Sequence, residues 1–154
     1  MLGGAPLVPL HKKGGFVQAY VSNELFSLLP MITYARDDEQ RRIRVILAGS
    51  VTLPDLLAVV DRQASEGTWT YGLLYDLREI ADPLSWSDTE ALLAQVRRLT
   101  SAHGSRGPVA VVSRSAATVG TTLMYAHRAG DDLNIEVFWD PLDAERWLDR
   151  YMRL

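Results

Sequence analysis

The sequence predicts one α/β domain, built on a mixed, mostly parallel sheet of about five strands with four helices. Three observations predict it. The chain has 154 residues, of which 47% are hydrophobic and 23% charged, as in ordinary globular proteins. Short apolar runs alternate with amphipathic stretches along most of the chain. Helix-capping residues stand between many of these segments, so the expected order is β-β-α-β-α-β-α-β-α.

The predicted elements begin with a hairpin. Residues 32–36 and 42–48 have strand character, and the polar run 37–40 between them predicts a turn. Thr52-Leu53-Pro54-Asp55 then forms a capping-box pattern that predicts a helix start. Gly67 stands where a left-handed residue would end that helix.

The middle of the chain predicts a central strand and a second helix. Residues 71–76 are an apolar run that ends at Asp76, which is typical of a strand buried on both faces. After a loop containing Pro83, the segment 87–90 repeats the capping-box pattern, with Ser87 as the expected cap. The helix is expected to continue to His103-Gly104.

Two further strand–helix units complete the pattern. Residues 108–113 and 135–139 predict strands, residues 116–130 a helix, and Asp140-Pro141 the start of a final helix. The expected inner face of the 116–130 helix is Ala116, Val119, Gly120, Leu123 and His127. The expected anchors of the final helix are Leu142, Trp147, Leu148 and Tyr151.

The first 30 residues differ in texture from the rest, so we predict an N-terminal extension of uncertain order over 1–30 and one domain over 31–154. The basic cluster at residues 11–13 invites a signal-peptide interpretation, but polar residues interrupt the apolar region after it. No apolar run approaches the roughly 20 residues needed to span a bilayer. The chain has no cysteine, which fits a reducing compartment, and we expect a cytoplasmic protein.

Composition and motifs argue against several function classes. A net charge of −3 makes nucleic acid an unexpected partner. Neither a glycine-rich nucleotide fingerprint nor a nucleophile elbow occurs. The three histidines are far apart in sequence and lack metal-ligand spacing. We therefore expect no cofactor, no metal and no enzymatic activity.

Candidate binding residues follow the predicted strands. Asp76 would stand at the carboxyl end of the central strand with Arg78 beside it, placed either to contact a ligand or simply to pair with each other. Ser113, Arg114 and Ser115 could form an anion site at a helix start, or one serine could merely cap that helix.

The loop before the second helix supplies the other candidates. Ser85 and Ser87 could carry a phosphoryl group near a helix N-terminus, or serve only as caps. Trp86, beside the proline loop, is the tryptophan expected to be exposed. His127 could be a general base, but a partly buried structural histidine is the favoured interpretation.

Three segments resemble the SpoIIAA-like branch of the STAS superfamily, whose more distant members are STAS/SEC14-like domains. They are Ile46-Leu47-Ala48-Gly49 with Thr52-Leu53-Pro54-Asp55, then Leu73-Leu74-Tyr75-Asp76-Leu77, and the closing run from Val137 to Leu148. In the antagonists of this family, a serine in an Asp-Ser-Ser-Gly-type turn is phosphorylated and decides which partner binds. Residues 82–88 of this chain, Asp-Pro-Leu-Ser-Trp-Ser-Asp, depart from that turn.

The resemblance implies a non-enzymatic binding or regulatory module that contacts a protein partner through the loops after its strands and through the second helix, and that could form a homodimer. The alternative is a carrier or sensor of a small lipid-like or anionic ligand. Its cleft would lie between sheet and helices, with Asp76, Arg78 and Arg114 at the mouth.

Overall fold

The computed structural model describes residues 7–12, 15–20 and 31–153. Within the first 30 residues, β1 (Leu7–Lys12) and β2 (Gly15–Tyr20) form an antiparallel pair. The remaining residues of the predicted extension lie outside the described residues. The larger sheet begins with β3 at Met31.

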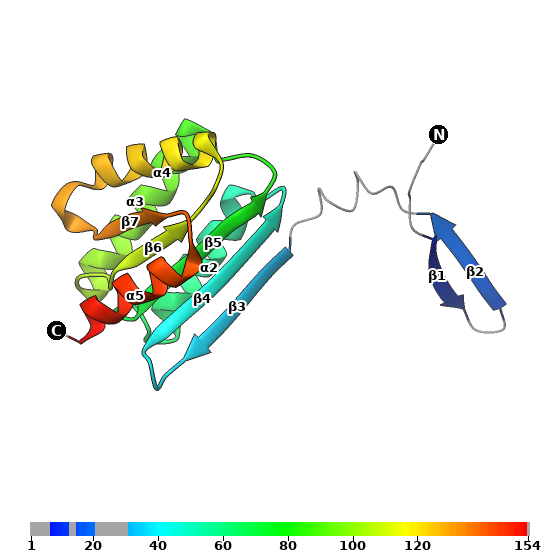
Figure 1. Cartoon of the computed structure of the whole chain (residues 1–154), viewed down its shortest axis with the longest axis horizontal. Coiled ribbons are helices and arrows are strands. Elements are labelled where there is room, and N and C mark those ends of the chain that lie inside the picture. Colours follow the sequence, from blue (N-terminus) through cyan, green and yellow to red (C-terminus); the bar gives the residue numbers. More distant parts are fainter. Residues whose placement is uncertain (1–6, 13–14, 21–30, 154) are drawn as a thin grey trace.

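A five-stranded sheet forms the centre of the fold (Figure 1). Its strands are β3 (Met31–Asp37), β4 (Arg42–Gly49), β5 (Gly72–Ile80), β6 (Val109–Val112) and β7 (Ile135–Phe138), adjacent in chain order. The β3–β4 hairpin is antiparallel, and the other neighbours are parallel. The predicted mixed, mostly parallel sheet is confirmed.

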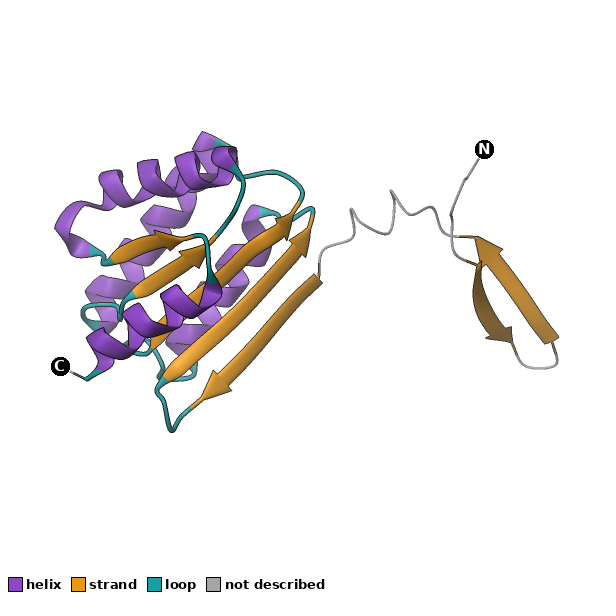
Figure 2. Ribbon diagram, viewed as in Figure 1, coloured by secondary structure: helices purple, strands orange, loops and turns teal. Residues whose placement is uncertain are grey.

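Four helices cover the sheet in two layers (Figure 2). They are α2 (Leu53–Ser65), α3 (Trp86–His103), α4 (Ala116–Ala129) and α5 (Pro141–Met152), with a 3₁₀ turn at Gly130–Asp132. Helices α2, α3 and α4 lie on one face, and α5 lies on the other. The predicted order of elements over residues 31–153 is confirmed.

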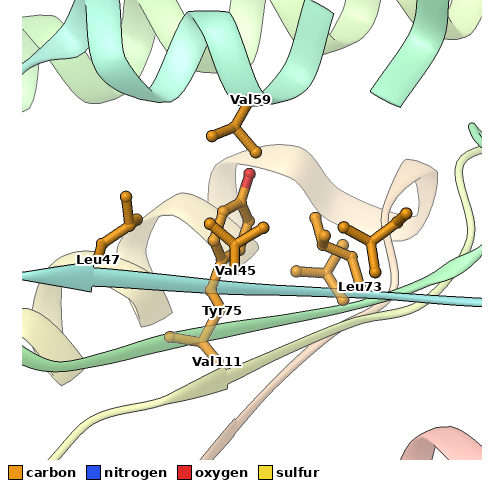
Figure 3. Packing of buried hydrophobic residues seen from close by; sticks show 8 residues of the cluster. Val45, Leu47, Val59, Leu73, Tyr75 and Val111 are labelled. Carbon is orange, nitrogen blue, oxygen red and sulfur yellow. The ribbon is translucent and has the colours of Figure 1, made fainter. Parts of the chain in front are cut away.

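Alternation along the strands builds a separate core on each face. On the α2 side, Val59 packs over side chains from the three strands β4, β5 and β6, as Figure 3 shows for part of this cluster. The strand members of this cluster are Ile43, Val45, Leu47, Leu73, Tyr75, Val109 and Val111. The intervening residues Leu74, Ala110 and Val112 point to the other face and pack against Ala144, Trp147 and Leu148 of α5.

Ion pairs fasten α5 to the strand beside it. The Arg42 side chain is 2% exposed and pairs with Glu145 and with Asp149, the latter at 3.0 Å. Arg44 also pairs with Glu145. Burial opposes ionisation of Glu145, but hydrogen bonds from Arg44 and Arg42 outweigh it and hold the pKa of the carboxyl below its usual range.

Two predicted helix starts have different outcomes. At α2 the carboxylate of Asp55 accepts hydrogen bonds from the Thr52 N–H at 2.8 Å and from its hydroxyl at 2.9 Å, and Gly67 has a φ of +73°. At α3 the predicted cap, Ser87, was wrong. The helix begins at Trp86 because Ser85 supplies the cap.

The predicted inner face of α4 was also wrong. Ala116, Gly120, Leu123 and His127 are exposed, and the buried positions are Thr118 and Ala129. Threonines form much of the inward stripe, so apolar periodicity pointed to the wrong side. In α5, Trp147 and Leu148 are buried as expected, but Leu142 and Tyr151 are exposed.

Candidate functional site

The start of α3 presents an exposed aromatic side chain between two serines. The Ser85 Oγ accepts a hydrogen bond from the Asp88 N–H at 3.1 Å, and the Thr89 hydroxyl donates to the Ser85 carbonyl oxygen at 2.8 Å. These bonds hold the first turn in place. Ser85, Trp86 and Ser87 are all exposed, and the Trp86 side chain is 45% accessible. We call Ser85, Trp86 and Ser87 the α3 entry surface.

Helix α4 adjoins this surface. Arg128 of α4 pairs with Glu90 in the second turn of α3 at 2.8 Å. Thr89 of α3 and Thr118 of α4 line the same cavity, which lies between the sheet and helices α2, α3 and α4. Thr89 and Thr118 each stand in the first turn of their helix, so both helix starts border this cavity, and both follow parallel strands that end at one edge of the sheet.

The pair Asp76–Arg78 is structural in its geometry. The Arg78 Nε lies 2.9 Å from Asp76 Oδ1, and Nη2 lies 2.7 Å from Oδ2. These hydrogen bonds hold the pKa of Asp76 below its usual range, although burial opposes that shift. The predicted position was wrong in one respect: Asp76 lies inside β5, which continues to Ile80.

Asp76 and Arg78 lie on the α5 side of the sheet, because side chains alternate along a strand. Their neighbours Tyr75 and Leu77 line the cavity on the other side. The expectation that Asp76, Arg78 and Arg114 stand at the mouth of a cleft between sheet and helices was therefore wrong, since none of the three lines that cavity.

Hydrogen bonds join the side chains of Ser113, Arg114 and Ser115 to neighbouring backbone groups. The Ser115 Oγ accepts from the Thr118 N–H at 3.4 Å and caps α4. The buried Ser113 Oγ accepts from the Ser115 N–H at 3.2 Å. Arg114 Nε donates to the Trp139 carbonyl oxygen at 3.3 Å, and the guanidinium lies 5.5 Å from the centre of the Trp139 ring.

Trp139 was not predicted as an exposed residue, although it is more exposed than Trp86, at 67%. It directly follows β7, which ends at Phe138, whereas the apolar sequence predicted a strand that includes Trp139, so nothing local signals its exposure. The arrangement places Trp139 and Arg114 near Asp76, whose pKa the Arg114 charge also helps to lower. The structure thus brings Arg114 close to Asp76.

The catalytic candidates lack supporting geometry. His127 is exposed, so the partly buried environment predicted for it was wrong. Within residues 31–153, no three His, Asp or Glu side chains are placed to hold a metal ion together. In the same range, none of the helices has the length and apolarity required to cross a bilayer.

The structure contains an apolar cavity of about 110 Å³, and its lining residues differ from those predicted for a ligand cleft. It lies between the sheet and helices α2, α3 and α4. Among its lining residues are Tyr75, Val111, Arg106, Thr122 and Tyr125. Arg106 and Tyr125 carry no local signal of this role, because the loop before β6 and the inward side of α4 meet only in the folded chain.

No protein-family model and no curated protein matches the sequence. Several solved structures match the chain in three dimensions, including the following two. A crystal structure of an anti-sigma factor antagonist from Mycobacterium paratuberculosis superposes with a TM-score of 0.52 and 19% identity, covering 77% of this chain and 94% of that chain. An uncharacterized protein with a SpoIIAA-like fold from Shewanella loihica gives a TM-score of 0.51 and 20% identity, covering 77% and 93%.

The chain has the SpoIIAA-like fold. In this SpoIIAA-like fold, the α3 entry surface follows the central strand β5. Residues 82–88, which include this surface, read Asp-Pro-Leu-Ser-Trp-Ser-Asp and not an Asp-Ser-Ser-Gly-type sequence. The turn holds a capped, regular helix start without a glycine, and Ser85 serves as that cap.

Proposed function

We propose that the chain is a non-enzymatic regulatory module of the cytoplasm that binds a protein partner through the α3 entry surface. The observation that carries this proposal is the exposed Trp86 on the capped first turn of α3, in a chain whose fold resembles that of an anti-sigma factor antagonist. A second copy of the chain is one candidate partner.

The fixed backbone turn that carries Trp86 supports a binding role. Exposed tryptophans are unusual on monomer surfaces and are enriched among residues that dominate binding energy. Because Ser85 and Thr89 fix the turn, little conformational entropy of the backbone would be lost when a partner covers the ring.

The hydroxyl groups at this surface suit a polar partner group. The hydroxyls of Ser85 and Ser87 can donate hydrogen bonds. Modification of Ser87 by a phosphoryl group would add negative charge at an exposed position. The proposed surface therefore offers a simple means of regulation.

The catalytic alternative receives less support. Asp76 is held by Arg78 in two hydrogen bonds and its pKa is lowered, which suits an ion pair and not a proton acceptor at neutral pH. His127 is exposed on α4, and the described residues place no nucleophile beside it.

Quantitative affinity purification from the source cells tests the proposal. The full chain is compared with Trp86→Ala and with the control Arg98→Ala, which lies on an exposed face near the far end of α3. We expect one stoichiometric partner that the Trp86 variant loses by at least about tenfold, as for a hot-spot residue, and that the control retains. A partner retained equally by both variants would contradict the proposed surface.

A further inference from the structure

The cavity between the sheet and helices α2, α3 and α4 is apolar along most of its length but contains a buried arginine. Its lining extends from Arg106, which precedes β6, to Asp82 and Leu84 beyond the end of β5. Arg106 is only 9% exposed. A guanidinium remains charged at any physiological pH, so its burial requires compensation.

The compensation that the chain itself supplies is incomplete. Arg106 Nε and Nη2 both donate to a single acceptor, the Gln63 Oε1, at 3.3 and 2.9 Å. Within residues 31–153, no carboxylate lies within ion-pair distance of Arg106. A neutral amide offsets the desolvation of a cation poorly, because charge-to-charge contacts are the stronger ones.

Neighbouring residues hold the guanidinium in a fixed orientation. The Gln63 side-chain amide donates to the Thr68 carbonyl oxygen at 3.2 Å, which directs its oxygen toward Arg106. The Trp69 ring lies with its centre 5.0 Å from the guanidinium carbon, and its Nε1 donates to the Gly104 carbonyl oxygen at 2.9 Å. The arginine is thus pre-organised, with donors left over for another acceptor.

Tyr125 adds a second polar group to the same cavity. Burial raises its pKa to about 12, although the charge of Arg106 opposes this shift, so the phenol is neutral at pH 7. A neutral phenol can donate a hydrogen bond to an anion that Arg106 attracts. Asp82, the acidic residue of the lining, is exposed and lies in the loop after β5.

We infer that this cavity binds a small aliphatic carboxylic acid, with its carboxylate at Arg106 and its hydrocarbon chain against Tyr75, Val111 and Leu92. A designed apolar cavity of about 150 Å³ accommodates a six-carbon ring. A cavity of about 110 Å³ is smaller, so it suits a short chain of roughly four to six carbons. This inference is independent of the proposed protein partner.

The test is a titration of the full chain with hexanoate, followed by calorimetry and by NMR chemical shifts of residues around the cavity. We expect saturable binding with a Kd of about 1 mM or tighter. Hexan-1-ol, of the same length without the charge, should bind at least about tenfold more weakly, because it cannot pair with Arg106. Equal binding of acid and alcohol, or no saturable binding of hexanoate, would overturn the inference.

Variants locate the bound carboxylate. Arg106→Met should weaken hexanoate at least about tenfold while leaving hexan-1-ol unchanged, and Arg98→Met on the exposed face of α3 should change neither. Tyr125→Phe removes one hydroxyl from the cavity and is the variant to use if Arg106→Met does not fold. It should weaken hexanoate roughly threefold to tenfold. The assignment would be overturned if Tyr125→Phe binds hexanoate as well as the natural chain and Arg106→Met either fails to fold or also binds hexanoate undiminished.

Discussion

Arg42 of β4 and Glu145 of α5 join the sheet to the C-terminal helix through a charge pair in which the arginine side chain is almost completely buried. The two residues are 103 positions apart in sequence. The pair therefore fixes where α5 crosses the strands. It also links the packing of β4, near the start of the domain, to that of the C-terminal helix.

Removing the carboxylate of this pair should destabilise the chain. Glu145→Gln leaves Arg42 with Asp149 as its remaining acid partner within the described residues, and we expect the free energy of unfolding to fall by about 1.5–3 kcal/mol. Urea unfolding at pH 7 measures it. The control Asp143→Asn breaks an exposed pair with Arg146 and should cost less than about 0.5 kcal/mol. Equal losses of unfolding free energy in the two variants would show that the buried pair contributes no more to stability than the exposed one.

Asp76 should make stability depend on acidity. Its pKa is lowered in the folded chain, so the unfolded chain takes up the proton first as the pH falls. The stabilisation is complete above the ordinary value of about 3.9 and disappears as the pH falls through the lower folded value. Asp76→Asn should cost about 1 kcal/mol at pH 7 and progressively less below pH 4.

Urea unfolding at a series of pH values tests this dependence. Glu39→Gln, which removes an exposed carboxylate from the β3–β4 turn, controls for the loss of one negative charge. A cost of Asp76→Asn that stays constant from pH 7 to pH 3 would mean that the ion pair with Arg78 is not the source of the stabilisation.

The cap of α3 distinguishes the two serines of the α3 entry surface. Ser85→Ala should lower stability by about 1 kcal/mol, because the Asp88 N–H loses its acceptor. Ser87→Ala, on the exposed face of the first turn, should change stability by less than about 0.5 kcal/mol. Thermal unfolding of both variants makes the comparison, and a larger effect at Ser87 would place the cap there instead.

Two glycines should respond oppositely to alanine. A Cβ at Gly107 would lie 2.3 Å from the Tyr71 carbonyl oxygen, so Gly107→Ala should cost about 3 kcal/mol or more. A Cβ at Gly120, inside α4, meets nothing within 4 Å, so Gly120→Ala should stabilise the chain by about 0.5–1 kcal/mol. Chemical unfolding checks both signs, and a stable Gly107→Ala would show that the loop before β6 can shift.

Local patterns predicted most of the fold. Alternating and apolar runs located the five strands of the larger sheet, because burial of those strands leaves a direct mark on composition. Capping residues located the starts of α2 and α5, since Asp55 and Asp140 bond to nearby backbone N–H groups.

The errors arose where tertiary contacts decide. Thr118 and Tyr125 face the core side of α4 while the apolar Leu123 and Met124 remain exposed, the reverse of what periodicity favours. The strand β5 continues past Asp76 because pairing with β4 extends to Gly49 opposite Ile80. Neither the inward face of α4 nor the end of β5 can be predicted from neighbouring residues in the sequence.

The candidate site was predictable only in part. The exposure of Trp86 followed from its place after a proline loop, and the structure confirms it. The partners of Arg114 and Arg106, by contrast, come from Trp139 and Gln63, which are remote in sequence. A side chain whose role depends on such long-range contacts gives no sequence signal.

The most direct test of the protein-binding proposal is photo-crosslinking in the source cells with a reactive amino acid at position 87, compared with position 101 on the same helix. Both positions carry an exposed serine in the natural chain. The account predicts one dominant crosslinked protein at position 87, either another protein or a second copy of the chain, and none at position 101. Equal crosslinking at the two positions, or none at position 87, would contradict the α3 entry surface as the binding site.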